Sequence, residues 1–226
     1  MQRIDTISEQ ATAYELVYQH DRREFCKRDP ETMAKNAGLK LRNGQITVPY
    51  YHTVLAVNAE NGEVTYEADP TKPVPVYPRM MTLHHLNGVK DGAQNSGILI
   101  PFRKIPMAAV FDSAYRSMAL EPFAQGFSGH LKDFVRAGEL LHTTPVNMGD
   151  HAVTFQCFPK IALTFVFWDG DDELPANATV LFDQNIADFI HPEDTVGLAI
   201  EGANLLLQAG NRPIAPTMDM VGLSKI

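Results

Sequence analysis

Apolar residues recur at helical spacing near both ends of the chain, and the residues between these two segments include strand-like patterns and further helical ones. Near the start, apolar residues recur every three or four positions and share one face of a predicted helix: Ile4, Ile7, Ala11, Tyr14 and Tyr18. A short second helix is predicted from Pro30, after the capping residue Asp29, to Gly38. A longer helix is predicted from Pro192 to Gly210.

A first β-rich segment follows the second helix. Residues 46–57 are rich in β-branched and aromatic side chains. The pair Asn61-Gly62 predicts a hairpin turn, because these residues tolerate the positive φ angles of such turns, and residues 64–67 form the returning strand. Residues 69–78 hold four prolines, so we expect an extended connection there.

Helices and then three strands follow. Helices are predicted over residues 78–87, 109–119 and 131–141, with Ser128 as a cap for the last. Strands are predicted over residues 152–157, 161–168 and 179–182. The run from Ile161 to Trp168 is almost entirely apolar, which is typical of a strand buried on both faces.

This order of elements predicts an α+β fold, because strands and helices do not alternate regularly. We expect a single domain over residues 1–211, with a mixed or antiparallel sheet packed with several helices. Residues 212–226 are expected to form a C-terminal arm that lies on the body or on a neighbouring copy in a homo-oligomer. Residues 69–78 are the alternative domain boundary.

Composition narrows the classes of protein. The 226 residues suffice for one sizeable core, and 19 basic against 27 acidic residues give a formal charge of −8, which disfavours nucleic acid as a partner. No apolar run reaches the length of a membrane span or a signal peptide, so we expect a cytoplasmic protein with no membrane partner. Two cysteines, Cys26 and Cys157, cannot hold an ordinary iron–sulfur cluster, so no intrinsic cluster is expected.

Common catalytic and nucleotide-binding motifs are missing. No P-loop occurs, and no Gly-x-Gly-x-x-Gly follows a predicted strand. Residues 126–130 resemble a nucleophile elbow around Ser128, but the final glycine is displaced and no apolar strand precedes it. Capping of a helix explains Ser128 better than nucleophilic catalysis does.

The pair His84-His85 is the first candidate site. Adjacent helical residues point about 100° apart, so one imidazole could face the core while the other faces a pocket. A neutral imidazole can ligate a metal ion or the metal centre of a tetrapyrrole, and these are the candidate ligands. The alternative is a hydrogen-bonded structural histidine beside a surface one.

The second candidate is the acidic loop that follows the apolar strand. Trp168 is a candidate cofactor-binding residue at its start, and the candidate metal ligands are Asp169, Asp171, Asp172 and Glu173. Carboxylates can bind a hard cation through oxygen, although the spacing does not fit an EF-hand. The alternative is a solvated hairpin loop. Asp183 would lie at the opposite end of such a hairpin, where it is expected to cap the following turn.

An ordered set of short segments is similar to a family. It comprises Leu83-His84, Pro101-Phe102 with Phe111, Gly149-Asp150, Trp168-Asp169 through Glu173-Leu174-Pro175, Leu181-Phe182-Asp183 and Glu193-Asp194. Together, from about Ala13 to Leu207, they resemble the domain-of-unknown-function family 3786. Its members occur largely in anaerobic bacteria and archaea, and some are fused to a four-iron–four-sulfur domain. Here Ala108-Ala109 stands where the family pattern suggests glycine.

The resemblance implies a setting of anaerobic redox or one-carbon metabolism and no particular reaction. Since this chain lacks a cysteine-rich segment, any iron–sulfur partner would be another polypeptide. We therefore expect a non-catalytic accessory protein that binds a cofactor, a metal or a redox partner. The alternatives are a metal-assisted hydrolase or transferase that uses the loop from Asp169 to Glu173, and a purely structural module that binds a partner.

Overall fold

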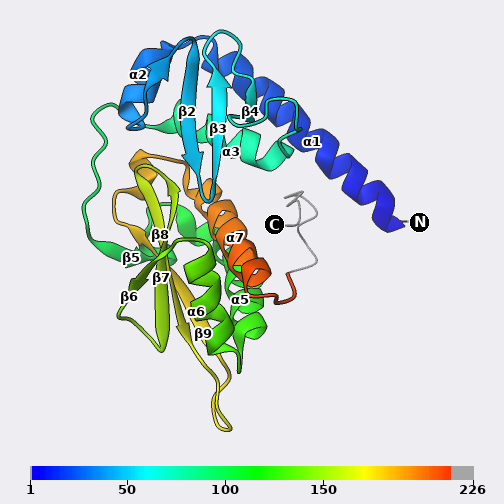
Figure 1. Cartoon of the computed structure of the whole chain (residues 1–226), viewed down its shortest axis with the longest axis vertical. Coiled ribbons are helices and arrows are strands. Elements are labelled where there is room, and N and C mark those ends of the chain that lie inside the picture. Colours follow the sequence, from blue (N-terminus) through cyan, green and yellow to red (C-terminus); the bar gives the residue numbers. More distant parts are fainter. Residues whose placement is uncertain (1, 215–226) are drawn as a thin grey trace. The chain divides into compact units, whose positions relative to one another are not determined.

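A computed structural model describes residues 2–214 of the chain, with side chains described from Ala13 onward (Figure 1). The described residues divide into two compact units: residues 2–93 with 188–190, and residues 94–187 with 191–214. Each unit contains helices and one antiparallel sheet, so the predicted α+β class is confirmed. The division falls after Ala93 rather than within residues 69–78, and the extent of the predicted domain stays a prediction.

The first unit packs helices on one face of a small sheet. Its helices are α1 (Gln2–Phe25), α2 (Pro30–Asn36) and α3 (Val76–Gly88). Asp29 caps α2 as predicted, because its carboxylate accepts a hydrogen bond from the Thr32 backbone N–H at 2.9 Å. The third helix begins at Val76, two residues before the predicted start at Pro78.

The four-stranded sheet of this unit has the order β1-β2-β3-β4. Its strands are β1 (Leu41–Arg42), β2 (Gln45–Tyr50), β3 (Thr53–Asn58) and β4 (Val64–Tyr66). Exposed and buried residues alternate along β2, so one face of that strand enters the core. Gly62 has a φ of +68° in the connection between β3 and β4, which confirms the predicted hairpin.

The second unit is built on a five-stranded antiparallel sheet of order β5-β9-β8-β7-β6. Its strands are β5 (Leu99–Pro101), β6 (Thr144–Val146), β7 (His151–Phe158), β8 (Ile161–Trp168) and β9 (Asn177–Asp183). Both edge strands are short and hold a proline, Pro101 or Pro145, which limits pairing with further strands.

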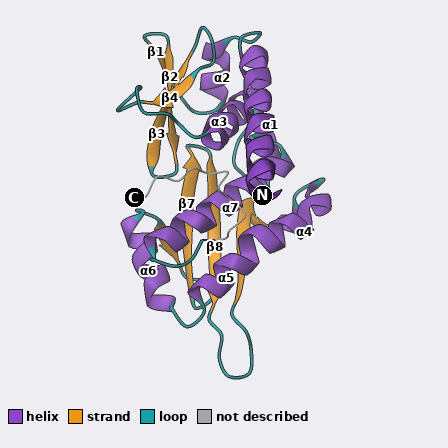
Figure 2. Ribbon diagram, turned by 90° about the vertical axis from the view of Figure 1, so that its right-hand side faces the viewer, coloured by secondary structure: helices purple, strands orange, loops and turns teal. Residues whose placement is uncertain are grey.

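Helices cover one face of this sheet. The helical segments of the second unit are η1 (Phe102–Lys104), η2 (Ala108–Phe111), α4 (Asp112–Tyr115), η3 (Arg116–Leu120), α5 (Glu121–Phe127), α6 (Leu131–Leu140) and α7 (Pro192–Ala209). In Figure 2, α5, α6 and α7 lie in front of β7 and β8. Between β9 and α7, residues 186–188 form the short helix η4.

Aromatic rings fill the layer between this sheet and its helices. Phe123, Phe127 and Phe134 from the helices meet Phe165 and Phe167 of β8, with ring centroids 5.6–6.4 Å apart. All five side chains are fully buried or nearly so. Odd-numbered residues of β8 therefore point into the helical layer, and the even-numbered ones point to the other face.

Two helix predictions need correction. The helix expected over residues 109–119 is broken into η2, α4 and the π-helix η3, in which the Glu121 N–H donates to the Arg116 carbonyl. Pro122 lacks the N–H that an α-helix would need there, which explains the wider turn. Ser128 does not cap α6, because the residue at that position is His130; Ser128 instead follows the last turn of α5.

The remaining expectations concern short strands, the arm and membrane spans. Neither β1 nor β6 was predicted, since two or three residues are too few to show a period. From residue 215 onward, the arm predicted over residues 212–226 lies outside the described part of the chain. None of the described helices is long and apolar enough to cross a membrane.

Candidate functional site

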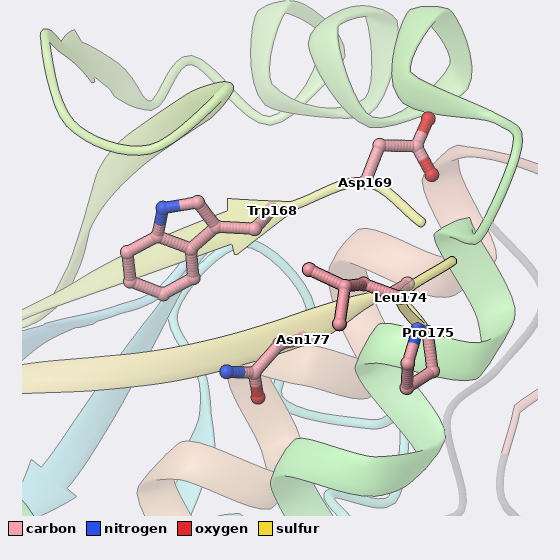
Figure 3. Close-up of a pocket in the computed structure, with 6 residues that line it drawn as sticks. Trp168, Asp169, Leu174, Pro175 and Asn177 are labelled. Atoms are coloured by element: carbon pink, nitrogen blue, oxygen red, sulfur yellow. The ribbon is translucent and has the colours of Figure 1, made fainter. Parts of the chain in front are cut away.

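Trp168 ends strand β8 and lines a pocket with the loop that follows (Figure 3). It pairs with Asn177 across the β8–β9 hairpin, so the two side chains share the sheet face away from the helices. The indole is 40% exposed, although the seven residues before it are buried or half-buried. Leu174 lies between Trp168 and Pro175, and the pocket measures about 550 Å³.

The loop over residues 169–176 holds its shape through its own backbone. The Asp171 carboxylate accepts hydrogen bonds from the N–H groups of Glu173 and Leu174, at 2.9 and 2.8 Å. These bonds hold the pKa of Asp171 below its ordinary value, so the group stays ionised at neutral pH. A Cβ on Gly170 would lie 2.7 Å from the Ala176 nitrogen, so glycine is required there.

Asp169 anchors the loop to the helical side of the sheet. Its carboxylate accepts a hydrogen bond of 2.7 Å from the Gly129 N–H, in the connection between α5 and α6. Its own N–H donates to the Asp150 carboxylate at 2.8 Å. Because adjacent residues of a strand point to opposite faces, Trp168 and Asp169 diverge, as Figure 3 shows. The Asp169 side chain therefore positions the loop.

The structure does not gather the candidate metal ligands into one group. Across the described residues, no three His, Cys, Asp or Glu side chains form a group that could hold a metal ion. The carboxylates of Asp169 and Asp171 are engaged with backbone N–H groups, while Asp172 and Glu173 are exposed on the loop. The four carboxylates give the loop beside the Trp168 pocket a negative charge.

The candidate histidines lie in α3, in the first unit, and have partners there. The Nε2 atom of His84 lies 3.0 Å from a carboxylate oxygen of the largely buried Asp21 on α1. His85 is 0% exposed, and its Nδ1 atom lies 2.9 Å from the Phe189 carbonyl oxygen. His85 therefore faces the core, whereas His84 is half-buried beside Asp21. Neither lines the Trp168 pocket.

Asp183 caps the turn that follows it, as predicted, and it also binds a second loop. It lies at the opposite end of β9 from the acidic loop, and its carboxylate accepts a hydrogen bond from the Asn185 N–H in the turn that follows. The same carboxylate also accepts bonds from the N–H groups of Ser96 and Gly97. Sequence reasoning missed this second loop, because 86 residues separate Gly97 from Asp183.

The sheet face opposite the helices carries almost no charge. The strand register shows which side chains share the face of Trp168. They belong to the even-numbered residues of β6, of β8 and of β7 up to Gln156, and to the odd-numbered residues of β5 and β9. Asp183 alone among them is charged, and it is buried with its oxygens accepting hydrogen bonds. The middle of this face is buried at Ala152, Thr164 and Val166, so only its margins reach solvent beside the acidic loop.

We predict that a cation quenches the fluorescence of Trp168 more strongly than an anion does. The acidic loop concentrates cations near the indole, and the chain has no other tryptophan. After each Stern–Volmer constant is divided by its value for free indole, we expect the constant for caesium to be about twofold higher than that for iodide. The difference between the two constants should vanish in high salt, which screens the charge of the loop. The double variant Asp172→Asn/Glu173→Gln should reduce the difference. Equal quenching in the wild type at low salt would contradict this prediction.

The comparisons with known proteins identify a family. No curated protein matches the chain, and no solved structure matches it. A family model described as a domain of unknown function, DUF3786, matches residues 29–204. That range includes α3, both sheets and the Trp168 pocket. The chain therefore belongs to the DUF3786 family.

Proposed function

We propose that this protein is a non-catalytic accessory protein that binds a cofactor with a flat ring at the Trp168 pocket. The observation that carries the proposal is an exposed indole on an apolar pocket wall, formed by Leu174 and Pro175, with the amide of Asn177 beside it. Aromatic side chains with few polar groups are typical of sites for small molecules, and about 550 Å³ is within their usual range.

The charge at the pocket favours a neutral or cationic ring. Four carboxylates lie within residues 169–173, and no basic residue occurs between Trp168 and Asn177. A phosphorylated ligand would meet repulsion there, whereas a cationic ring would gain cation–π attraction to the indole. We therefore propose stacking on Trp168 as the main source of affinity.

The pocket offers little for catalysis. One carboxylate oxygen of Asp169 accepts hydrogen bonds from both the Gly129 and the Gly170 N–H groups, so it is engaged in holding the loop. No histidine, cysteine or lysine lines the pocket. These contacts favour binding over the metal-assisted hydrolase or transferase. A separate iron–sulfur partner and a cytoplasmic, anaerobic setting stay predictions.

A charge series of flat probes tests the proposal. We expect equilibrium dialysis to show binding in the order methylene blue, riboflavin, flavin mononucleotide, since these carry a positive, no and a negative charge. Stacking on an aromatic side chain is worth about 1–3 kcal/mol, so Trp168→Leu should weaken riboflavin binding about tenfold.

Leu140 provides the matched control, because it is 55% exposed on α6, away from the pocket. Leu140→Ala should bind all three probes as the wild type does. The proposal fails if the wild type binds neither riboflavin nor methylene blue, or if Trp168→Leu binds both unchanged.

A further inference from the structure

The two most exposed large apolar side chains that the structure describes belong to a short segment before α4. Met107 is 77% exposed and Val110 is 80% exposed, and they lie directly before η2 and within it. The third in this order is Leu174, at 68%, in the wall of the Trp168 pocket. Apolar surface that is clustered in water marks an interaction site. We propose that residues 106–110, the apolar tip, dock in the Trp168 pocket of a second copy of the chain.

The apolar tip has a defined shape because buried residues anchor it. Residues 106, 107, 109 and 110 are exposed, whereas Ile105 and Ala108 are 2% and 0% exposed. The Ala108 N–H donates a hydrogen bond of 3.2 Å to the Ile105 carbonyl, which closes the turn. Met107 has a φ of +64°, a conformation that favours glycine. The fold therefore holds a methionine side chain in water at a position where glycine would be less strained.

The apolar tip lies in a basic segment of an acidic protein. Residues 92–120 hold three basic residues, Arg103, Lys104 and Arg116, and one acidic residue, Asp112. Arg103 pairs with Asp112 at 2.6 Å, so the exposed Lys104 and Arg116 carry the remaining positive charge. The whole chain carries −8, which makes this segment an exception. A positive apolar tip fits a pocket that is apolar inside and negative beside it.

The Trp168 pocket has these properties, which is why a second copy is the occupant. Its wall is apolar, and the loop over residues 169–173 brings four carboxylates beside it. A methionine sulfur makes favourable contacts with aromatic rings, so in the docked pair Met107 lies against the indole. Lys104 and Arg116 then approach the carboxylates of the loop, and two copies of an acidic chain attract each other where they touch.

The apolar tip and the pocket lie apart within one copy. In Figure 2, α4 directly follows the apolar tip and lies well above the loop between β8 and β9. The contact therefore joins different copies. Since every copy carries one tip and one pocket, the contact is head to tail, between unlike surfaces. Contacts of such small area are weak, so we expect an assembly that dissociates on dilution.

Docking of the apolar tip and binding of a ligand exclude each other, a consequence that rests on the proposed function. A flat ring stacked on Trp168 occupies the surface that Met107 contacts in the docked pair. Because the effect of one partner on the other is reciprocal, a bound ligand releases the second copy, and the second copy weakens ligand binding. The fraction of free pockets thus decreases as the protein concentration rises.

Sedimentation equilibrium of matched variants tests this inference. We expect the average mass of the wild type to rise above 25.1 kDa with concentration. Met107→Glu should associate about tenfold more weakly, because it brings a negative charge to an apolar pocket beside four carboxylates. Met107→Gly suits the φ of +64°, so it keeps the fold and should also associate more weakly. Leu140→Glu, the same change in charge on α6, should associate like the wild type.

A mixing experiment identifies the surfaces that meet. Asp172→Lys/Glu173→Lys reverses charge beside the pocket and leaves the apolar tip intact, so this variant alone should stay at 25.1 kDa. Its tip should dock in the intact pocket of Met107→Glu, so an equimolar mixture should be heavier than either variant alone. Circular dichroism shows whether each variant is folded.

Three results would overturn the inference. One is a wild type that stays at 25.1 kDa from about 1 µM to about 1 mM. Another is a folded Met107→Glu that associates as Leu140→Glu does. The third is a mixture of the two folded variants that is no heavier than its components.

Riboflavin on the same samples separates this inference from the proposed function. Excess riboflavin should lower the mass of the wild type toward 25.1 kDa, and Met107→Glu should bind riboflavin at least as tightly as Leu140→Glu. Association that requires Met107, in a protein that binds neither riboflavin nor methylene blue, would refute the proposed function alone. A wild type that binds the probes at Trp168 but never associates would refute the docking alone.

Discussion

Gly149→Ala is expected to destabilise the protein by about 2–4 kcal/mol. Gly149 has a φ of +58°, where an L-residue costs about 1–2 kcal/mol. A Cβ there would also lie 2.5 Å from the Phe167 carbonyl oxygen, and overpacking costs about 1–3 kcal/mol. The strain falls on the backbone beside Trp168. Urea unfolding followed by Trp168 fluorescence measures the loss.

Gly129→Ala is the matched control for this prediction. Gly129 has a φ of +71°, but no atom lies within 4 Å of where its Cβ would be. It should therefore lose only the backbone part, about 1–2 kcal/mol. Equal losses for the two variants would show that the contact with Phe167 has no energetic weight.

Asp183→Ala is expected to cost about 2–4 kcal/mol, because three backbone N–H groups lose a charged acceptor. These belong to Ser96, Gly97 and Asn185, at 2.8–3.0 Å from the carboxylate. Burial alone would raise the pKa of Asp183, but these hydrogen bonds outweigh burial and lower it. The carboxylate thus ties the loop before β5 to the end of β9.

The free energy by which Asp183 stabilises the fold should decrease at acidic pH. Since the pKa is lower in the folded state, the contribution is complete above the pKa of an unfolded aspartate, about 3.9. It is lost as the pH falls through the lower folded value. The stability difference between wild type and Asp183→Asn should therefore be constant from about pH 5 to 8 and shrink below about pH 4. A difference that grows on acidification would contradict this assignment.

The sequence predicted those elements that have a long apolar pattern, a turn with characteristic residues or a capping residue. The β8–β9 hairpin, the Asn61-Gly62 turn and the cap at Asp29 are of this kind. The π-helix before Pro122 was not predicted, because a proline within a helical pattern indicates the first turn of a new helix and not a wider turn of the same one. Such details depend on packing rather than on periodicity.

The candidate site was only partly predictable. Trp168 and the acidic loop were identified, but Trp168 closes an almost continuous apolar run and reads as buried. Its exposure follows from the register with Asn177, which places both side chains on the face without helices. The sequence likewise gives no sign that Asp169 accepts a hydrogen bond from the N–H of Gly129, 40 residues away.

Fluorine NMR of the protein labelled with 5-fluorotryptophan tests the central claim most directly. The chain has one tryptophan, so the spectrum reports on Trp168 alone. We expect the resonance to shift on addition of riboflavin or methylene blue, and to move back when a fluorine-free competitor, unlabelled Leu140→Ala protein, takes up the probe. A resonance that does not move while dialysis shows either probe bound would place binding elsewhere and contradict the account.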